Sequence, residues 1–162
     1  SGEYSFSPVI QSLAPSMDIQ VASNFERLLY FILEGDSEKL RKVMSRIGNE
    51  GKYCFEDFSL DGFASSSVSD CEIPEIIRDV MDKYNYLVDP HTACAFKELN
   101  PAEKYVILAT AHPAKFPMVY EKAGLSRPVS GVLESLKKNK MTKYKVGSSA
   151  SDIRSFIESE IG

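Results

Sequence analysis

The sequence has 162 residues, enough for one domain with a buried core, and 43% of them are hydrophobic. Its net charge of −4 argues against nucleic acid as the main partner, and no apolar run approaches the roughly 20 residues that span a bilayer. The three cysteines form no CxxC pair, which argues against a zinc site. These features predict a soluble, globular, cytoplasmic protein with reduced thiols.

The first elements follow an irregular lead-in at residues 1–14, in which Ser1-Gly2 has the form of a cloning remnant. A capping box with Ser23 as N-cap and Glu26 three residues later predicts a helix that ends at Gly35. Asp36 predicts the N-cap of a second helix, closed by Gly48. Both predictions depend on apolar residues at helical spacing: Phe25, Leu28, Leu29, Ile32 and Leu33, then Leu40, Val43, Met44 and Ile47.

The middle of the chain is less regular before it becomes helical again. Residues 53–70 have no clear period, although residues 64–68 have the composition of a short strand. A helix follows, with one apolar side made of Ile73, Ile76, Ile77, Val80, Met81 and Tyr84. Asp89 as N-cap and Pro90 at the first helical position predict another helix, which extends to about Leu99.

The last third of the chain predicts a strand at 105–109, a helix at 117–123 before Gly124, and a helix that opens at Pro128. A short strand around Tyr144 and Val146 and a terminal helix capped by Ser149 complete the pattern. Helices that alternate with short apolar strands predict an α/β fold, mostly helical. The strands are too few for a self-contained doubly wound sheet, so we expect a piece of a larger α/β protein.

The most informative segment is 109–116, directly after the predicted strand at 105–109. Ligands of open α/β sheets bind beyond the carboxyl ends of strands. Thr110, His112 and Lys115 place a hydroxyl, an imidazole and an amine there. Each also has an ordinary structural interpretation: a hydroxyl bonded to a carbonyl, a histidine at a strand–loop junction, or an exposed lysine in a first helical turn.

Two helix starts are candidate anion sites because their first N–H groups are free and the helix dipole favours negative charge. One combines Ser23 and Asn24 with Arg27 one turn further, and the other contains His91 and Thr92. Simple capping is the alternative for both. The sequence has no Gly-rich phosphate loop and no GxSxG elbow, and two distant histidines without HExxH argue against a catalytic metal.

Three blocks resemble the threonine synthase family, in the family's order and at similar distances. Residues 15–29 resemble its "SPSMDIxVxSNFERLL" block, residues 89–93 its "DPHTA" block, and residues 109–116 its "STAHPAKF" block. Two positions depart from the pattern: Ala22 stands where proline is common, and Cys94 where a small aliphatic residue is common. The resemblance implies that residues 15–162 are the C-terminal portion of a catalytic domain of this family.

The resemblance implies a partial three-layer α/β sandwich of the tryptophan-synthase-β-like type, fold type II of the pyridoxal-phosphate enzymes. It implies conversion of O-phospho-L-homoserine and water to L-threonine and phosphate, with no membrane or nucleic-acid partner. Thr110 matches the threonine whose hydroxyl faces the pyridine nitrogen of the cofactor. A neutral hydroxyl does not hold that nitrogen protonated as a carboxylate would, so it moderates the electron sink. Ser23, Asn24, Arg27, His91, Thr92, His112 and Lys115 are then candidates for substrate or phosphate contacts.

The family's Schiff-base lysine and the loop that holds the cofactor phosphate lie upstream of these blocks and have no counterpart here. We therefore expect a fragment without the catalytic lysine, inactive and without retained cofactor when it lacks the N-terminal half. A transit peptide in that half would place the enzyme in a plastid. Two alternatives remain open: a non-catalytic threonine-synthase-like binding or signalling protein, and a free-standing phosphate-binding domain that uses Ser23, Asn24 and Arg27.

Overall fold

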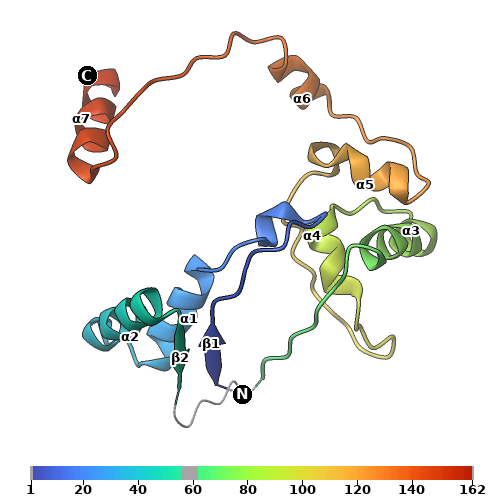
Figure 1. Ribbon diagram of the computed structural model, residues 1–162. Coiled ribbons are helices and arrows are strands. Elements are labelled where there is room, and N and C mark those ends of the chain that lie inside the picture. Colours follow the sequence, from blue (N-terminus) through green and yellow to red (C-terminus); the bar gives the residue numbers. More distant parts are fainter. Residues whose placement is uncertain (1, 56–61, 162) are drawn as a thin grey trace. The chain divides into compact units, whose positions relative to one another are not determined.

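A computed structural model describes residues 2–55 and 62–161 of the chain (Figure 1). It consists mainly of helices with two short strands, and it divides into two compact units, Ser1–Pro128 and Val129–Gly162. Among the described residues, no helix is long and apolar enough to cross a membrane.

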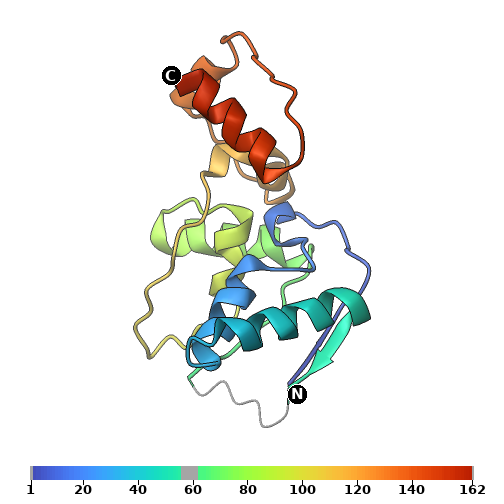
Figure 2. The same cartoon turned by 90° about the vertical axis from the view of Figure 1, so that its left-hand side faces the viewer.

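Two short strands pair near the start of the first unit. Strand β1 (Glu3–Ser5) lies antiparallel to β2 (Lys52–Cys54), with Tyr4 opposite Tyr53. The predicted lead-in is therefore not wholly irregular, because its first residues find a partner about fifty positions further along the chain. Helix α2 (Ser37–Glu50) contacts β2, and both views show it beside the strand pair (Figures 1 and 2).

Helices α1 (Ser23–Ile32) and α2 enclose a small apolar cluster with the strands. Its buried members are Leu29, Val43 and Ile47, at positions that the helical spacing predicts. Aromatic rings cover it, and the ring of Tyr4 stacks on that of Phe25 at a centroid distance of 4.5 Å.

The ends of these two helices correct two predictions. Ala22, not Ser23, is the N-cap of α1, because Ser23 already belongs to the helix. Asp36 is confirmed as the N-cap of α2, where Oδ1 accepts from the N–H groups of Glu38 and Lys39. Helix α2 continues through Gly48 and ends at Gly51, whose φ of 69° is the left-handed conformation that suits glycine.

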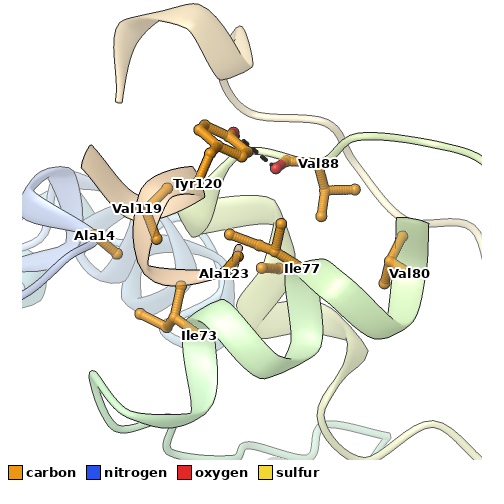
Figure 3. Close-up of a cluster of buried hydrophobic side chains, with 9 residues drawn as sticks. Ala14, Ile73, Ile77, Val80, Val88, Val119, Tyr120 and Ala123 are labelled. Carbon is orange, nitrogen blue, oxygen red and sulfur yellow. Dashed lines mark hydrogen bonds between the residues drawn. The ribbon is translucent and has the colours of Figure 1, made fainter. Parts of the chain in front are cut away.

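A second apolar cluster lies where α3 (Glu72–Tyr84) meets α4 (Pro90–Ala93) and α5 (Pro117–Lys122) (Figure 3). The phenol of Tyr120 is buried among aliphatic side chains and donates to the carbonyl of Val88 at 2.9 Å. Burial, followed by the negative charge of Asp89, raises the pKa of Tyr120, so the phenol stays neutral. The other buried members are Ala14, Ile73, Ile77, Val80, Val88, Ala93, Val119 and Ala123.

Two helices in this region begin or end at other residues than predicted. Helix α4 is followed by a 3-10 turn, η2 (Cys94–Phe96), so the helical segment ends three residues before Leu99. Helix α6 (Gly131–Leu136), in the second unit, begins after Ser130, whose hydroxyl accepts from the N–H of Leu133. Pro128 therefore precedes this helix and does not open it.

None of the three strands predicted between residues 64 and 146 forms among the described residues. The clearest case is 105–109, where the side chain of Val106 is 93% exposed and that of Leu108 is 77% exposed. A strand needs a neighbour for its backbone N–H and C=O groups, and here no strand of the described chain pairs with it. The apolar run is present in the sequence, but the sheet around it is not.

The second unit contains α6 and α7 (Ala150–Ile161). Ser149 caps α7 as predicted, because its hydroxyl accepts from the N–H of Asp152 at 3.1 Å. The ring of Phe156 contacts that of Tyr144 at a centroid distance of 5.1 Å. The side chains of Ile153 and Ile157 on this helix are about half exposed.

Glu72 supports the start of α3 and makes the fold sensitive to acid. Hydrogen bonds from Ser69 and then from Lys97 lower the pKa of Glu72 from 4.5 to about 2. Because the folded-state pKa is the lower one, the stabilisation is complete above pH 4.5 and is lost as the pH falls toward about 2. We expect Glu72→Gln to flatten the dependence of Tm on pH in this window. A Glu98→Gln control should leave the wild-type dependence, and an equal flattening by both variants would contradict the assignment.

Candidate functional site

A buried polar cluster lies at the start of α4, formed by Asp89, His91 and Thr92. The Asp-Pro sequence produces it locally: Pro90 sets the first helical residue, and the Asp89 carboxylate turns back to cap the helix. Its Oδ1 accepts from the backbone N–H of His91 at 2.9 Å and from that of Thr92 at 3.4 Å. All three side chains are 4% exposed or less, so the cluster belongs to the interior.

Both ring nitrogens of His91 are occupied by protein partners. Nδ1 lies 2.9 Å from Asp89 Oδ1, and the backbone N–H of Ser16 donates to Nε2 at 3.1 Å. Since Nε2 accepts, the proton is on Nδ1 and the ring is neutral. The ring of Phe116 packs against it at a centroid distance of 4.7 Å. His91 therefore joins three of the resembling blocks, and neither nitrogen is free for a phosphate.

Thr92 connects this buried cluster to Thr110. Its hydroxyl bonds Asp89 Oδ2, and its oxygen accepts from the backbone N–H of Thr110 at 3.0 Å. The two threonine hydroxyl oxygens are 3.2 Å apart. Thr110 itself is exposed, so its hydroxyl lies at the surface with a bonded network behind it. A ligand can reach Thr110 but not Thr92.

The Asp89 carboxylate is ionised. Burial opposes the charge, but hydrogen bonds from the Thr92 hydroxyl and from His91 outweigh it and lower the pKa of Asp89. A carboxylate that accepts several hydrogen bonds is also held in one orientation. Asp89 is thus a fixed negative charge, and the hydroxyl groups of Thr92 and Thr110 lie between it and the surface.

After Thr110, the exposed His112 caps a short turn, η3 (Pro113–Lys115), which ends at the exposed Lys115. His112 Nδ1 accepts from the backbone N–H of Ala114 at 3.1 Å, so this ring caps the turn and its Nε2 stays open to a ligand. Lys115 is exposed beside it. Chain connectivity keeps both near Thr110, although the expected strand before them is absent.

The other predicted anion site lies on α1. Ser23, Asn24 and Arg27 are all exposed, and Arg27 Nη1 donates to Asn24 Oδ1 at 3.1 Å. A surface hollow of about 460 Å³ includes Ser23 and Arg27 in its wall, with the acidic Glu26 and with Tyr30, Phe31 and Leu40. No hydrogen bond or ion pair found among the described residues joins this group to Thr110. The structure thus separates the predicted site residues into two groups.

Sequence reasoning assigned no site role to Asp89 or Ser16, although Asp89 supports Thr110 through Thr92 and Ser16 holds the ring of His91. Asp89 was expected only to cap a helix, and Ser16 only to belong to a motif. The signal for Asp89 was the position of two further donors, His91 and Thr92, within one turn of a capping carboxylate. Nothing local could reveal Ser16, because its bond to His91 crosses 75 residues of chain.

Comparison with known proteins supports the motif resemblance. Residues 90–157 match the family model of the threonine synthase C-terminal region. The chain is 37% identical over 125 residues to threonine synthase of Pseudomonas aeruginosa and 33% identical over 138 residues to human threonine synthase-like 2. These matches include 72% and 77% of the chain but 27% and 28% of the relatives, so the chain spans about a quarter of their length.

A solved structure gives the same result for the fold. The PLP-bound threonine synthase from Brucella melitensis superimposes with a TM-score of 0.74 at 30% identity, over 98% of this chain and 36% of that one. The predicted fold class is therefore confirmed: an α/β fold of the type II pyridoxal-phosphate enzymes, mostly helical with few short strands. In sequence and in fold, the chain corresponds to the C-terminal portion of the threonine synthase family.

Proposed function

We propose that this chain supplies the C-terminal part of a threonine synthase catalytic unit. The unit would convert O-phospho-L-homoserine and water to L-threonine and phosphate with pyridoxal phosphate as cofactor. The observation that carries the proposal is the exposed Thr110 hydroxyl, which the buried Asp89 and Thr92 side chains hold from behind. A surface hydroxyl held this firmly suits a ligand atom that must be positioned.

The donors and acceptors around Thr110 fit the edge of a pyridine ring. Such an edge offers one nitrogen in the ring plane, and a single fixed hydroxyl matches it. When bound, pyridoxal phosphate supplies an electron sink for the carbanion chemistry of the substrate. The part of Thr110 in this proposal is to orient the ring nitrogen, with Thr92 and Asp89 keeping the hydroxyl in place.

Phosphate and substrate contacts belong to the more exposed groups. Ser23 and Asn24 lie in the first turn of α1, where the helix dipole favours an anion, and Arg27 adds a positive charge one turn further. His112 and Lys115 offer an imidazole nitrogen and an amine within five residues of Thr110. We propose these five as candidates for the substrate phosphate and carboxylate, and His91 as a support for the site.

The exposed apolar run at 105–109 supports a larger unit. Val106 and Leu108 are open to solvent, although their composition suits a buried strand of a parallel sheet. We propose that the N-terminal half of the catalytic unit covers this run and contributes the Schiff-base lysine and the loop for the cofactor phosphate. Residues 15–162 would then form one portion of that unit, with residues 1–14 leading into it.

The proposal predicts no stable cofactor complex for the isolated chain. We expect added pyridoxal phosphate to give no visible absorbance band that survives dialysis, because the lysine that would bond it is elsewhere in the catalytic unit. The measurement is an absorbance spectrum before and after dialysis, with Lys115→Ala as the matched variant. A retained band that Lys115→Ala abolishes would show that this chain carries its own Schiff-base lysine.

Activity can be tested in a chimera in which this chain replaces the matching segment of the Pseudomonas aeruginosa relative. We expect the chimera to release phosphate from O-phospho-L-homoserine. Thr110→Val should lower kcat/KM by about 3- to 10-fold, as loss of one hydrogen bond predicts, and Thr110→Ser should restore most of it. Equal rates in the Val and Ser variants would remove Thr110 from the site.

The second candidate is a non-catalytic protein of the same fold, considered because one of the matches is named threonine synthase-like and not threonine synthase. The chimera separates the two proposals. A folded chimera that binds cofactor and releases no phosphate would favour the non-catalytic function, whereas phosphate release would favour the enzyme.

A further inference from the structure

We propose that Asp89 is a positioning residue that acts through Thr92 to make the Thr110 hydroxyl a hydrogen-bond acceptor toward its ligand. The site would then select a ring nitrogen that carries a proton. This inference rests on the proposed function, in which Thr110 meets the pyridine ring of the cofactor. It extends that function by assigning the direction of each hydrogen bond behind the site.

The first step is the bond between Asp89 and Thr92. An ionised carboxylate has no proton to donate, so the Thr92 hydroxyl is the donor to Asp89 Oδ2. The other oxygen, Oδ1, already accepts from His91 Nδ1 and from two backbone N–H groups. Because Ser16 fills His91 Nε2, the imidazole cannot turn and leave the carboxylate.

The second step follows from the single proton of Thr92. With that proton directed to Asp89, the Thr92 oxygen has only lone pairs left. One accepts the backbone N–H of Thr110 at 3.0 Å. The other lies toward the Thr110 hydroxyl oxygen at 3.2 Å, so in this pair Thr110 is the donor.

Thr110 therefore presents a hydrogen-bond acceptor at the surface. Its proton points inward to Thr92, and only oxygen lone pairs remain for an incoming group. A lone pair attracts an N–H, as on a protonated pyridine nitrogen, and repels the lone pair of an unprotonated one. To meet an unprotonated nitrogen, Thr110 would have to turn its proton outward and give up its bond to Thr92.

This result modifies the expectation for a neutral hydroxyl at the ring nitrogen. A hydroxyl that can turn freely serves either protonation state equally. Here the Asp89 charge orients two hydroxyls in series, since hydrogen bonds in a chain polarise one another. The Asp89 carboxylate thus favours a protonated ring nitrogen at the surface, as a carboxylate in direct contact would, but it acts through Thr92 and Thr110.

An amide at position 89 should reverse the chain of bonds. In Asp89→Asn, the one carbonyl oxygen can still accept from His91, which turns the NH₂ group toward the Thr92 oxygen. Thr92 must then accept there and donate its proton to Thr110, and Thr110 donates outward. The variant changes the direction of the bonds while conserving the size of the side chain.

The first measurement is proton NMR of the isotope-labelled 162-residue chain without ligand. We expect a slowly exchanging Thr92 hydroxyl resonance, shifted downfield by its bond to the carboxylate, which Asp89→Asn moves upfield or abolishes. Thr92→Ser should keep the resonance, and Thr92→Val should speed amide exchange at Thr110 by removing its acceptor. If Asp89→Asn does not fold, Thr92→Val still tests the connection to Thr110. A Thr92 hydroxyl unaffected by Asp89→Asn, or a Thr110 amide unaffected by Thr92→Val, would overturn the inference.

The second measurement uses pyridoxal phosphate labelled with ¹⁵N in the ring, added to the chimera and its variants. We expect the ¹⁵N shift near the protonated value in the parent and near the unprotonated value in Asp89→Asn. A bound ring with the same shift in both would overturn the ligand preference. A ring that does not bind, together with the expected hydroxyl result, would overturn the proposed function while the assigned bond directions stand.

Discussion

Asp89→Ala is expected to destabilise the first unit by about 3–5 kcal/mol, a large share of the stability of an ordinary domain. The change removes the acceptor of the Thr92 hydroxyl, of His91 Nδ1 and of two backbone N–H groups, all in a buried cluster. Each buried donor left without a partner costs about 1–3 kcal/mol, and the losses do not simply add. Urea denaturation followed by circular dichroism measures the difference in free energy of unfolding.

Asp36→Ala is the matched control, because Asp36 is also a helix N-cap that accepts two backbone N–H bonds. It lies at the surface, so its loss exposes the freed N–H groups to water. We expect a clearly smaller loss of stability for this variant than for Asp89→Ala. Equal losses for the two variants would mean that Asp89 contributes only as a cap, and the network behind Thr110 would lose its structural basis.

Ile77→Ala is the second change with a large expected effect. Ile77 has no exposed surface and lies among the apolar side chains that α3, α4 and α5 share (Figure 3). Removing a buried isoleucine side chain leaves a cavity and costs about 2–5 kcal/mol. The measurement is the urea midpoint at constant slope, since a changed slope would indicate a change in the unfolding transition itself.

Ile10→Ala makes the same chemical change in the same unit, at a side chain that is 83% exposed. Such a surface substitution should change stability by no more than about 0.5 kcal/mol. A loss at Ile10 as large as that at Ile77 would contradict the assignment of the buried cluster. It would also show that residues near the N-terminus have apolar neighbours in solution that the structure lacks.

The helices could be predicted well because their signals are local. The apolar spacing placed α2 and α3 correctly, and the side chain of Asp36 identified the start of α2. The misplaced ends reflect choices between neighbouring residues. Gly51, rather than Gly48, adopts the left-handed conformation that ends α2, and only the paths of adjoining segments decide between them. Ser23 failed as a cap because the helix includes it.

Strands could not be predicted as reliably, because a strand depends on a partner elsewhere in the chain. Glu3–Ser5 is only three residues long, with one apolar side chain between two polar ones, which is too short to identify a strand, yet it pairs with β2. Residues 105–109 have strong strand composition, and no partner among the described residues pairs with them. The composition of a segment indicates whether it can form a strand. Whether it does form one depends on the presence of another strand to pair with.

The candidate site shows the same distinction between local and distant information. Motif resemblance identified Thr110, Thr92 and His91, and the structure brings these three together. Among the described residues, no hydrogen bond or ion pair connects Ser23, Asn24 or Arg27 to them, so a role for these three in the same site is a proposal. The role of Asp89 depends on the four hydrogen-bond donors that surround its carboxylate in the folded chain, and the sequence alone does not show this arrangement.

The uncovered run at 105–109 has a practical consequence for handling the protein. The run contains tyrosine, valine, isoleucine and leucine in succession, with no charged residue and no proline. Such a segment can pair edge to edge with the same segment of another copy of the chain, which makes it prone to aggregation. Preparations at high concentration should therefore cloud or gel sooner than the net charge alone would suggest. A lysine in place of Val106 should keep such solutions clear.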